Sequence, residues 1–244
     1  MYAVCQRNML EYNHLSASMN HLFRQIEAMY ELPLFPLNTV LFPGMPLRLH
    51  IFEERYKLMI GRCYADGQPF GITLIKSGKE VGGRAHPFHI GCTATITEVE
   101  PLADGQMNIV AVGSERFEIQ SLKHDEPYLV GVVNDAPLAN LNSVLLTDNS
   151  HRLRPWVRRY LEILAEASDA RFDMGQLPRD PMRLAYLAAF LLQVPASQKQ
   201  TLLDINDAEE LLTDLRDIYR REVTLLRAML TAREAEDIGT FSAN

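Results

Sequence analysis

Residues 32–44 read LPLFPLNTVLFPG, and residues 46–56 continue as PLRLHIFEERY. Proline fixes φ and removes a hydrogen-bond donor, and Gly44 permits a turn, so this stretch predicts short extended segments joined by turns. Large aromatic side chains stand between the prolines and favour buried positions. We interpret the following residues as mainly structural determinants of core and turns: Pro36, Phe42, Pro43, Gly44, Pro46, Phe52 and Tyr56.

A strand-like pattern extends from residue 31 to about residue 135. Proline and glycine punctuate this half, and its apolar residues recur at every second position, most clearly at Ile90, Cys92, Ala94 and Ile96. Asp104-Gly105 favours a hairpin turn, and one helix over residues 53–65 interrupts the strands. We predict a mostly antiparallel, barrel-like sheet with strands at residues 32–35, 47–51, 70–75, 90–96, 107–112, 116–122 and 128–134.

The apolar residues take a helical period from residue 151 onward. Asp180 before Pro181 predicts one helix start, and Asp207 predicts another, because an aspartate at this position accepts hydrogen bonds from the first turn. The last helix runs to about residue 233 and is about 40 Å long. We therefore expect five segments: an N-terminal extension (1–30), a β-rich lobe (31–135), a linker (136–150), a helical lobe (151–236) and a flexible tail (237–244).

The composition is that of a folded globular protein. The 244 residues are 47% apolar and carry a formal charge of −7, which disfavours nucleic acid and anionic lipid as partners. Three cysteines, an odd number without paired spacing, indicate reduced thiols in the cytoplasm. No apolar run reaches the roughly 18 residues that span a bilayer. Residues 18–29 form either a short helix or a loose extension.

The opening stretch resembles the start of the Lon protease N-terminal domain family. The similarity continues through residues 70–72, 90–94, 104–105, 112–113, 116–117, 128–130 and 199–203. The resemblance implies an α+β fold, in which a PUA-like antiparallel β-barrel lobe with one inserted helix precedes a helical bundle that ends in a long helix. It also implies a role in binding proteins or exposed peptide segments. Glu53, Arg55, Gly113, Arg116 and Phe117 complete the motif residues of this family.

The ATPase and peptidase modules of full-length Lon proteases are not expected in this chain. The Gly78-Lys79 pair has Thr73 where a phosphate-binding loop needs its first glycine, and Glu80 where it needs a hydroxyl. No serine shows the sequence pattern of a nucleophile. We therefore predict a free-standing, non-enzymatic binding module without a cofactor, with a protease or chaperone as a further candidate partner. A small hydrolase whose site is assembled in space is the catalytic alternative.

Two other patterns suggest a binding site but have simpler interpretations. His86, His89 and Cys92 have the spacing of metal ligands, yet alternation along the strand places Cys92 and His89 on opposite faces, so we predict no metal site. The arginines at 152, 154, 158 and 159 are followed by acids at helical spacing, which favours a solvated helix. RNA binding remains the alternative in that case, because other PUA-like folds bind RNA.

Two arginines among the motif residues have a candidate role in recognition. Arg55 and Arg116 either satisfy backbone carbonyls and nearby acids, which we favour, or recognise an acidic group of a client protein. The client-binding surface is expected to be a groove between the two lobes or an open edge of the sheet.

Overall fold

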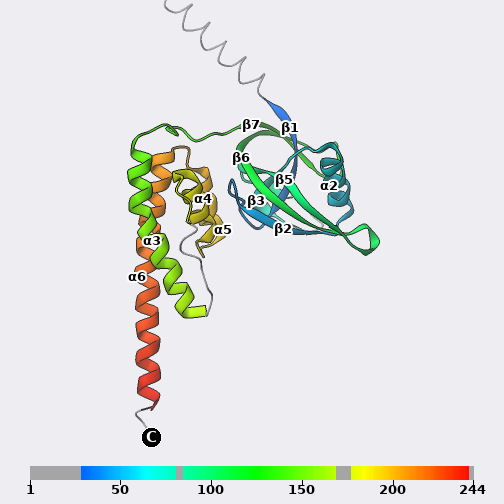
Figure 1. Ribbon diagram of the computed structural model, residues 1–244. Coiled ribbons are helices and arrows are strands. Elements are labelled where there is room, and N and C mark those ends of the chain that lie inside the picture. The colour runs from blue at the N-terminus through cyan, green and yellow to red at the C-terminus, as the bar shows by residue number, and fades with distance from the viewer. Residues whose placement is uncertain (1–28, 81–84, 169–176, 242–244) are drawn as a thin grey trace, which may run out of the picture.

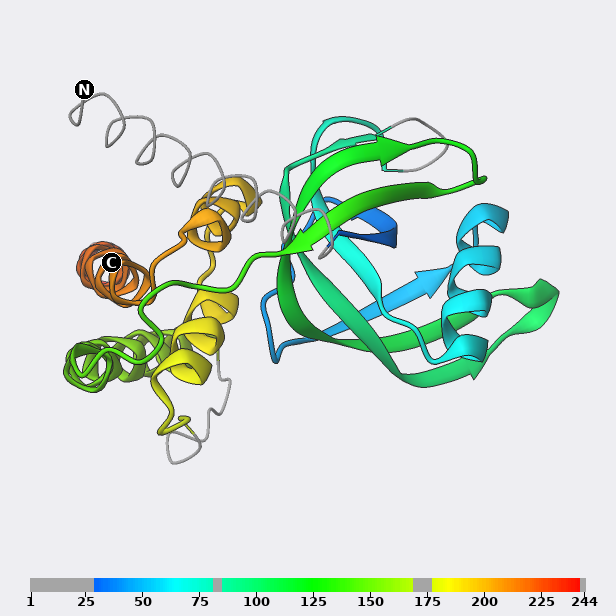
Figure 2. The same ribbon diagram turned by 90° about the horizontal axis from the view of Figure 1, so that it is seen from above.

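The computed structural model describes residues 29–80, 85–168 and 177–241 of the 244-residue chain. A β lobe and a helical lobe lie side by side, joined by one connecting segment after the last strand (Figure 1). The view from above shows that the helices after the connecting segment gather at one side of the barrel, whereas the inserted helix, α2 (Glu54–Asp66), lies at the opposite side (Figure 2). The short helix considered for the N-terminal extension lies outside the described residues, apart from its last position.

The strands form a closed, mostly antiparallel barrel, as predicted. Hydrogen bonds link β1, β7, β6, β5 and β3 in that order, and the parallel pairing of β1 with β3 closes the ring. Two further strands extend the sheet, because β2 pairs with β6 and β4 pairs with β3. The strands are β1 (Tyr30–Leu37), β2 (Pro46–Ile51), β3 (Phe70–Gly78), β4 (Ala85–Pro87), β5 (Ile90–Pro101), β6 (Met107–Lys123) and β7 (Leu129–Asp135).

Two details of the strand prediction were wrong. The strands predicted at 107–112 and 116–122 are one continuous strand, β6. The first part of β6 pairs with β2, and its last part pairs with β7, so β6 changes partner near Gly113. A glycine between two apolar runs looks like a break in the sequence, whereas here it lets the neighbouring loop approach the strand. The three-residue strand β4 is too short to leave a recognisable pattern.

Local signals place the inserted helix and the hairpin as predicted. Helix α2 (Glu54–Asp66) buries Tyr56, Met59, Ile60 and Cys63. It ends at Gly67, which has a φ of 62°, and the N–H of Gln68 donates to the carbonyl of Cys63 at 2.9 Å. Between β5 and β6, Asp104 and Gly105 both have positive φ, at 58° and 68°. Each feature follows from residues close together in the chain.

The helical lobe contains α3 (Leu145–Ser168), α4 (Pro181–Leu191), α5 (Ala196–Asp204) and α6 (Ala208–Phe241). Asp180 accepts the N–H of Arg183 at 2.8 Å, and Asp207 accepts those of Glu209 and Glu210 at 2.8 and 3.0 Å, so both predicted helix starts are confirmed. These hydrogen bonds lower the pKa of Asp207.

Two predicted boundaries in this half need correction. The linker is shorter than residues 136–150, because α3 begins at Leu145, where the hydroxyl of Ser143 accepts the backbone N–H of Leu145 and caps the helix. Helix α6 runs to Phe241, so it includes residues 237–241 of the segment predicted as a tail. The described residues contain no helix long and apolar enough to cross a membrane.

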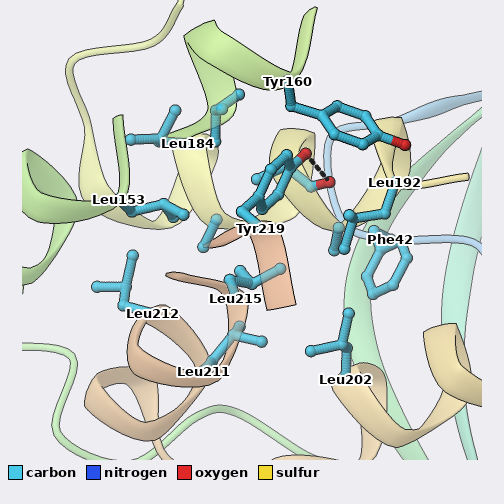
Figure 3. Close-up of a cluster of buried hydrophobic side chains, with 14 of the residues drawn as sticks. Phe42, Leu153, Tyr160, Leu184, Leu192, Leu202, Leu211, Leu212, Leu215 and Tyr219 are labelled. Atoms are coloured by element: carbon cyan, nitrogen blue, oxygen red, sulfur yellow. Dashed lines mark hydrogen bonds between the residues drawn. The ribbon is translucent and has the colours of Figure 1, made fainter. Parts of the chain in front are cut away.

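One hydrophobic core extends from the helical lobe into the β lobe. Tyr219 of α6 donates its hydroxyl to the carbonyl of Ala188 at 2.8 Å, and its ring meets that of Tyr160 edge-on (Figure 3). Phe42, from the loop between β1 and β2, lies in the same cluster beside Leu192 and Leu202 (Figure 3). The two lobes therefore share buried apolar contacts in addition to the connecting segment.

Candidate functional site

A groove of about 380 Å³ lies between the two lobes. We call it the interlobe groove. Residues 43–44 and residues 114–116 of β6 line it from the β lobe, and Met182, Arg183 and Tyr186 line it from α4. Residues 136–138 and Leu141 of the connecting segment complete it. Its volume lies within the usual range for ligand pockets, and its place between two lobes is typical of binding sites.

Backbone hydrogen bonds hold the loop that forms one wall of the interlobe groove. The N–H of Gly44 donates to the carbonyl of Gly113 at 2.8 Å, and the N–H of Gly113 donates to the carbonyl of Met45 at 3.0 Å. Gly44 has a φ of 77°, which favours glycine. The same loop places the Phe42 ring 6.4 Å from that of Tyr186. Three motif residues, Phe42, Gly44 and Gly113, thus hold the loop in place where the two lobes meet.

Arg116 is the most unusual side chain of the interlobe groove, because only 3% of its surface is exposed. Its Nη2 donates to the Oδ1 of Asn206 at 2.9 Å. Its Nε and Nη1 are buried without a hydrogen bond among the residues that the structure describes. Burial lowers the pKa of Arg116, while Tyr186 and Asp204 have the opposite effect. The sequence predicted a carbonyl or acidic partner, and the structure instead provides a neutral amide.

The carboxylate of Asp204, which raises the pKa of Arg116, has its own hydrogen bond. Asp204, at the end of α5, accepts the side-chain N–H of Gln200 at 2.7 Å. Burial raises the pKa of Asp204, and the bond from Gln200 and the charge of Arg116 oppose that rise. Gln200 also donates to the carbonyl of Ile90 in β5 at 3.0 Å. Polar contacts therefore connect α5 to the β lobe next to the groove.

A second group of motif residues lies elsewhere, beside a smaller hollow of about 210 Å³ on the barrel. Arg55 lies 4.5 Å from the centre of the Tyr56 ring and forms an ion pair with Glu53 at 3.0 Å. Tyr56 stacks on Phe35 at 3.9 Å, and desolvation raises the pKa of Tyr56 to about 12. Pro36 is buried and also lines this hollow. No residue lines both this hollow and the interlobe groove.

The remaining motif residues show no common site. Phe117 is fully buried in a small cluster with Leu32 and Leu34. Pro46 is exposed at the start of β2, and Phe52 is 46% exposed with its ring stacked on that of His50. The structure therefore divides the motif residues between core, loop and two hollows.

The residues with metal-ligand spacing have different surroundings in the structure. Cys92 is fully buried, and desolvation raises its pKa to about 12, so its thiol stays protonated at neutral pH. The Nδ1 of His89 instead faces the carbonyl of Ile119 at 3.4 Å. Among the described residues, no three His, Cys, Asp or Glu side chains are grouped so that they could hold a metal ion.

Sequence reasoning missed two parts of the interlobe groove. Leu138 and Leu141 lie in the segment predicted as a linker, and Met182 and Tyr186 lie on the helix predicted to start at Asp180. Apolar residues within an otherwise polar connection were the available signal, since a simple linker does not need them. Leu138 is buried, whereas Leu141 is 48% exposed.

Comparison with known proteins finds a Lon domain family and Lon protease relatives. The model of the ATP-dependent protease La (LON) substrate-binding domain matches residues 31–221. Lon protease 2 of Myxococcus xanthus is 26% identical over 201 residues, and Lon protease of Anaeromyxobacter dehalogenans is 24% identical over 201 residues. Each alignment covers 80% of this chain and 24% of the relative, so the chain spans about a quarter of these proteases.

Two solved structures share the fold. The Lon N-terminal domain protein from Xanthomonas campestris is 25% identical with a TM-score of 0.52, over 76% of this chain and 96% of that one. The N-terminal domain of Mycobacterium avium complex Lon protease is 20% identical with a TM-score of 0.62, over 78% of this chain and 98% of that one. Together with the family match, the barrel and the helical lobe show that this chain belongs to the Lon substrate-binding domain family.

Proposed function

We propose that this protein is a non-enzymatic module that binds exposed apolar segments of other proteins in the interlobe groove. The observation that carries the proposal is the groove itself, whose apolar side chains come mainly from the connecting segment and α4, while the β lobe contributes polar lining residues that include the buried Arg116. Apolar walls with a few polar groups are typical of sites that bind an extended segment. Membership of a substrate-binding family supports the same role.

Exposed apolar residues continue from the groove along the connecting segment. Leu141 is 48% exposed, Val144 is 87% exposed and Leu145 is 50% exposed. Leu141 lines the groove, and the other two follow within four positions at the start of α3. Contiguous exposed apolar residues commonly mark a protein-binding surface. We infer that an apolar client segment lies in the groove and continues over these residues.

Substitution of this surface should weaken client binding. We expect the double variant Leu141→Asp/Val144→Asp to bind a fluorescent, unfolded apolar peptide about 10-fold more weakly or worse, because two aspartates must be desolvated beside the ligand. Fluorescence anisotropy measures the change in affinity. Leu102→Asp is the matched control, since Leu102 is 38% exposed near the β5–β6 hairpin. Equal weakening by both variants, or none by the double variant, would contradict the proposed surface.

The proposal places the protein in the cytoplasm, where it acts without its own catalysis. Cys63 and Cys92 are free and buried, which fits a reducing compartment. Desolvation raises the pKa of Cys63 to about 11 and that of Cys92 to about 12, so neither thiol is an activated nucleophile. Absence of peptide cleavage by the purified protein during the binding experiment would support a non-enzymatic role.

A second candidate function is that of an adaptor, which docks onto a protease or chaperone through α6. Leu225 and Met229 are 52% and 69% exposed on the same helix, four positions apart, so they lie on one face. Deletion of residues 207–244 is a poor test, because Leu212, Leu215 and Tyr219 of α6 are fully buried in the core.

The adaptor function is better tested by surface substitution. We expect Leu225→Lys/Met229→Lys to fold normally and to lose a protease or chaperone subunit that wild type captures from native extract, because the charges disrupt an apolar interface. Quantitative mass spectrometry of the captured proteins measures the loss. Arg216→Ala, at a partly exposed position on α6, serves as the control on the same helix. Unchanged capture by the double variant would remove this candidate.

A further inference from the structure

We propose that the interlobe groove recognises a carboxylate on an apolar peptide segment, with Arg116 as the residue that binds it. This inference rests on the proposed function above and names the chemical class of segment that the groove selects. The source of the carboxylate is either the free C-terminus of the peptide or an acidic side chain between apolar residues. Both present the same planar group, which matches the paired N–H donors of arginine.

The first argument is the incomplete hydrogen bonding of Arg116. A guanidinium has five N–H donors, and burial of an unpaired donor is costly. Arg116 is only 3% exposed, and its Nε and Nη1 have no hydrogen-bond partner among the described residues. Within the described part of the chain, Nη2 is the one side-chain nitrogen of Arg116 that is bonded, and its partner is Asn206. An incoming carboxylate would supply two oxygens to donors that are already fixed in place.

The second argument is the charge around Arg116. Its hydrogen-bonded partner is a neutral amide, and no ion pair of Arg116 occurs within the part of the chain that the structure describes. Asp204 raises the pKa of Arg116, and that carboxylate already accepts a hydrogen bond from Gln200. Glu115 and Arg183 line the groove with opposite charges and lie at exposed positions. A buried cation without a bonded anion favours an anionic ligand.

The third argument is the surface next to Arg116. Tyr186 lines the groove together with Arg116, and so do Leu138, Leu141 and Met182. These side chains offer apolar contact to the residues that carry or flank the carboxylate. A free inorganic anion would leave this surface uncovered, whereas an apolar peptide end would cover it. The combination therefore indicates a carboxylate attached to an apolar segment.

The test compares three forms of one labelled apolar decapeptide on the full-length protein. The forms are a free C-terminal acid, a C-terminal amide, and an amide with one internal glutamate between leucines. We expect wild type to bind the amide at least about 10-fold more weakly than the free acid, because the amide removes the charge-assisted pair with Arg116. If the glutamate form recovers the affinity, the groove accepts side-chain carboxylates as well.

Variants separate recognition by Arg116 from a purely structural role. Arg116→Met should bind the acid and the amide equally, whereas Arg116→Lys should keep part of the preference because it keeps the charge. Asn206→Ala removes the hydrogen bond to Nη2 of Arg116 and should retain the preference. The comparison in wild type needs no substitution, so misfolding of a variant does not obstruct the test.

The outcomes distinguish carboxylate recognition from the proposed peptide-binding function on which it rests. Equal binding of all three peptides by wild type would overturn carboxylate recognition and leave peptide binding intact. Lack of binding by any form at millimolar concentration would overturn both. A preference for the acid that persists in a folded Arg116→Met protein would also overturn the role assigned to Arg116.

Discussion

Replacement of Phe42 by alanine should lower the free energy of unfolding by about 3–5 kcal/mol. Phe42 is 1% exposed and comes from the β lobe, yet it packs in a cluster made mostly of helical residues (Figure 3). Alanine removes the buried ring and leaves a cavity that the shared core fills only in part. The expected loss is large compared with the 5–15 kcal/mol by which domains are usually stable.

Because the chain has a single tryptophan, its fluorescence can test whether the substitution in the β lobe also destabilises the helical lobe. Trp156 lies on α3 in the helical lobe, so its fluorescence reports a change made in the other lobe. Urea denaturation followed at this residue should show a lower midpoint for Phe42→Ala. The control is Phe52→Ala, whose ring is 46% exposed and whose effect should stay within about 1 kcal/mol. An unchanged Trp156 midpoint would mean that the lobes unfold independently.

The elements that sequence reasoning predicted well are specified by nearby residues. The starts at Asp180 and Asp207, the end of α2 at Gly67 and the turn at Asp104 each need only a few neighbouring positions. The order of the lobes follows from the change of apolar period, and the closed barrel was expected from the number and spacing of the strands. These properties are local or nearly so.

The candidate site was less predictable because its parts are distant in the chain. Arg116 was recognised as a motif residue, but its partner Asn206 lies 90 positions away and had no distinguishing pattern. Leu138 and Met182 reach the same groove from a connecting segment and a helix. Their proximity is a result of tertiary packing, which a periodic pattern does not encode. The sequence suggested a groove between the lobes without identifying its walls.

Replacement of Gly113 by alanine should destabilise the protein by about 1–3 kcal/mol or more, although alanine normally stabilises relative to glycine. A Cβ at this position would lie 2.4 Å from the carbonyl oxygen of Phe42 and 3.1 Å from the Sγ of Cys92. The nearest obstacle is backbone, which has little freedom to move. Gly113 also bonds Gly44 and Met45, so the added methyl group should displace the whole loop. Chemical denaturation measures the loss.

The same substitution at Gly61 is the matched control. Gly61 lies inside α2, and a Cβ there would meet nothing within 4 Å, so Gly61→Ala should stabilise by about 0.5–1 kcal/mol. A double-mutant cycle then tests the mechanism. If Gly113→Ala acts by moving Phe42 out of the shared core, the double variant with Phe42→Ala should lose less stability than the sum of the single losses. Strict additivity would show that Gly113 and Phe42 stabilise the protein independently, and that the loop does not transmit strain from the barrel to the helical lobe.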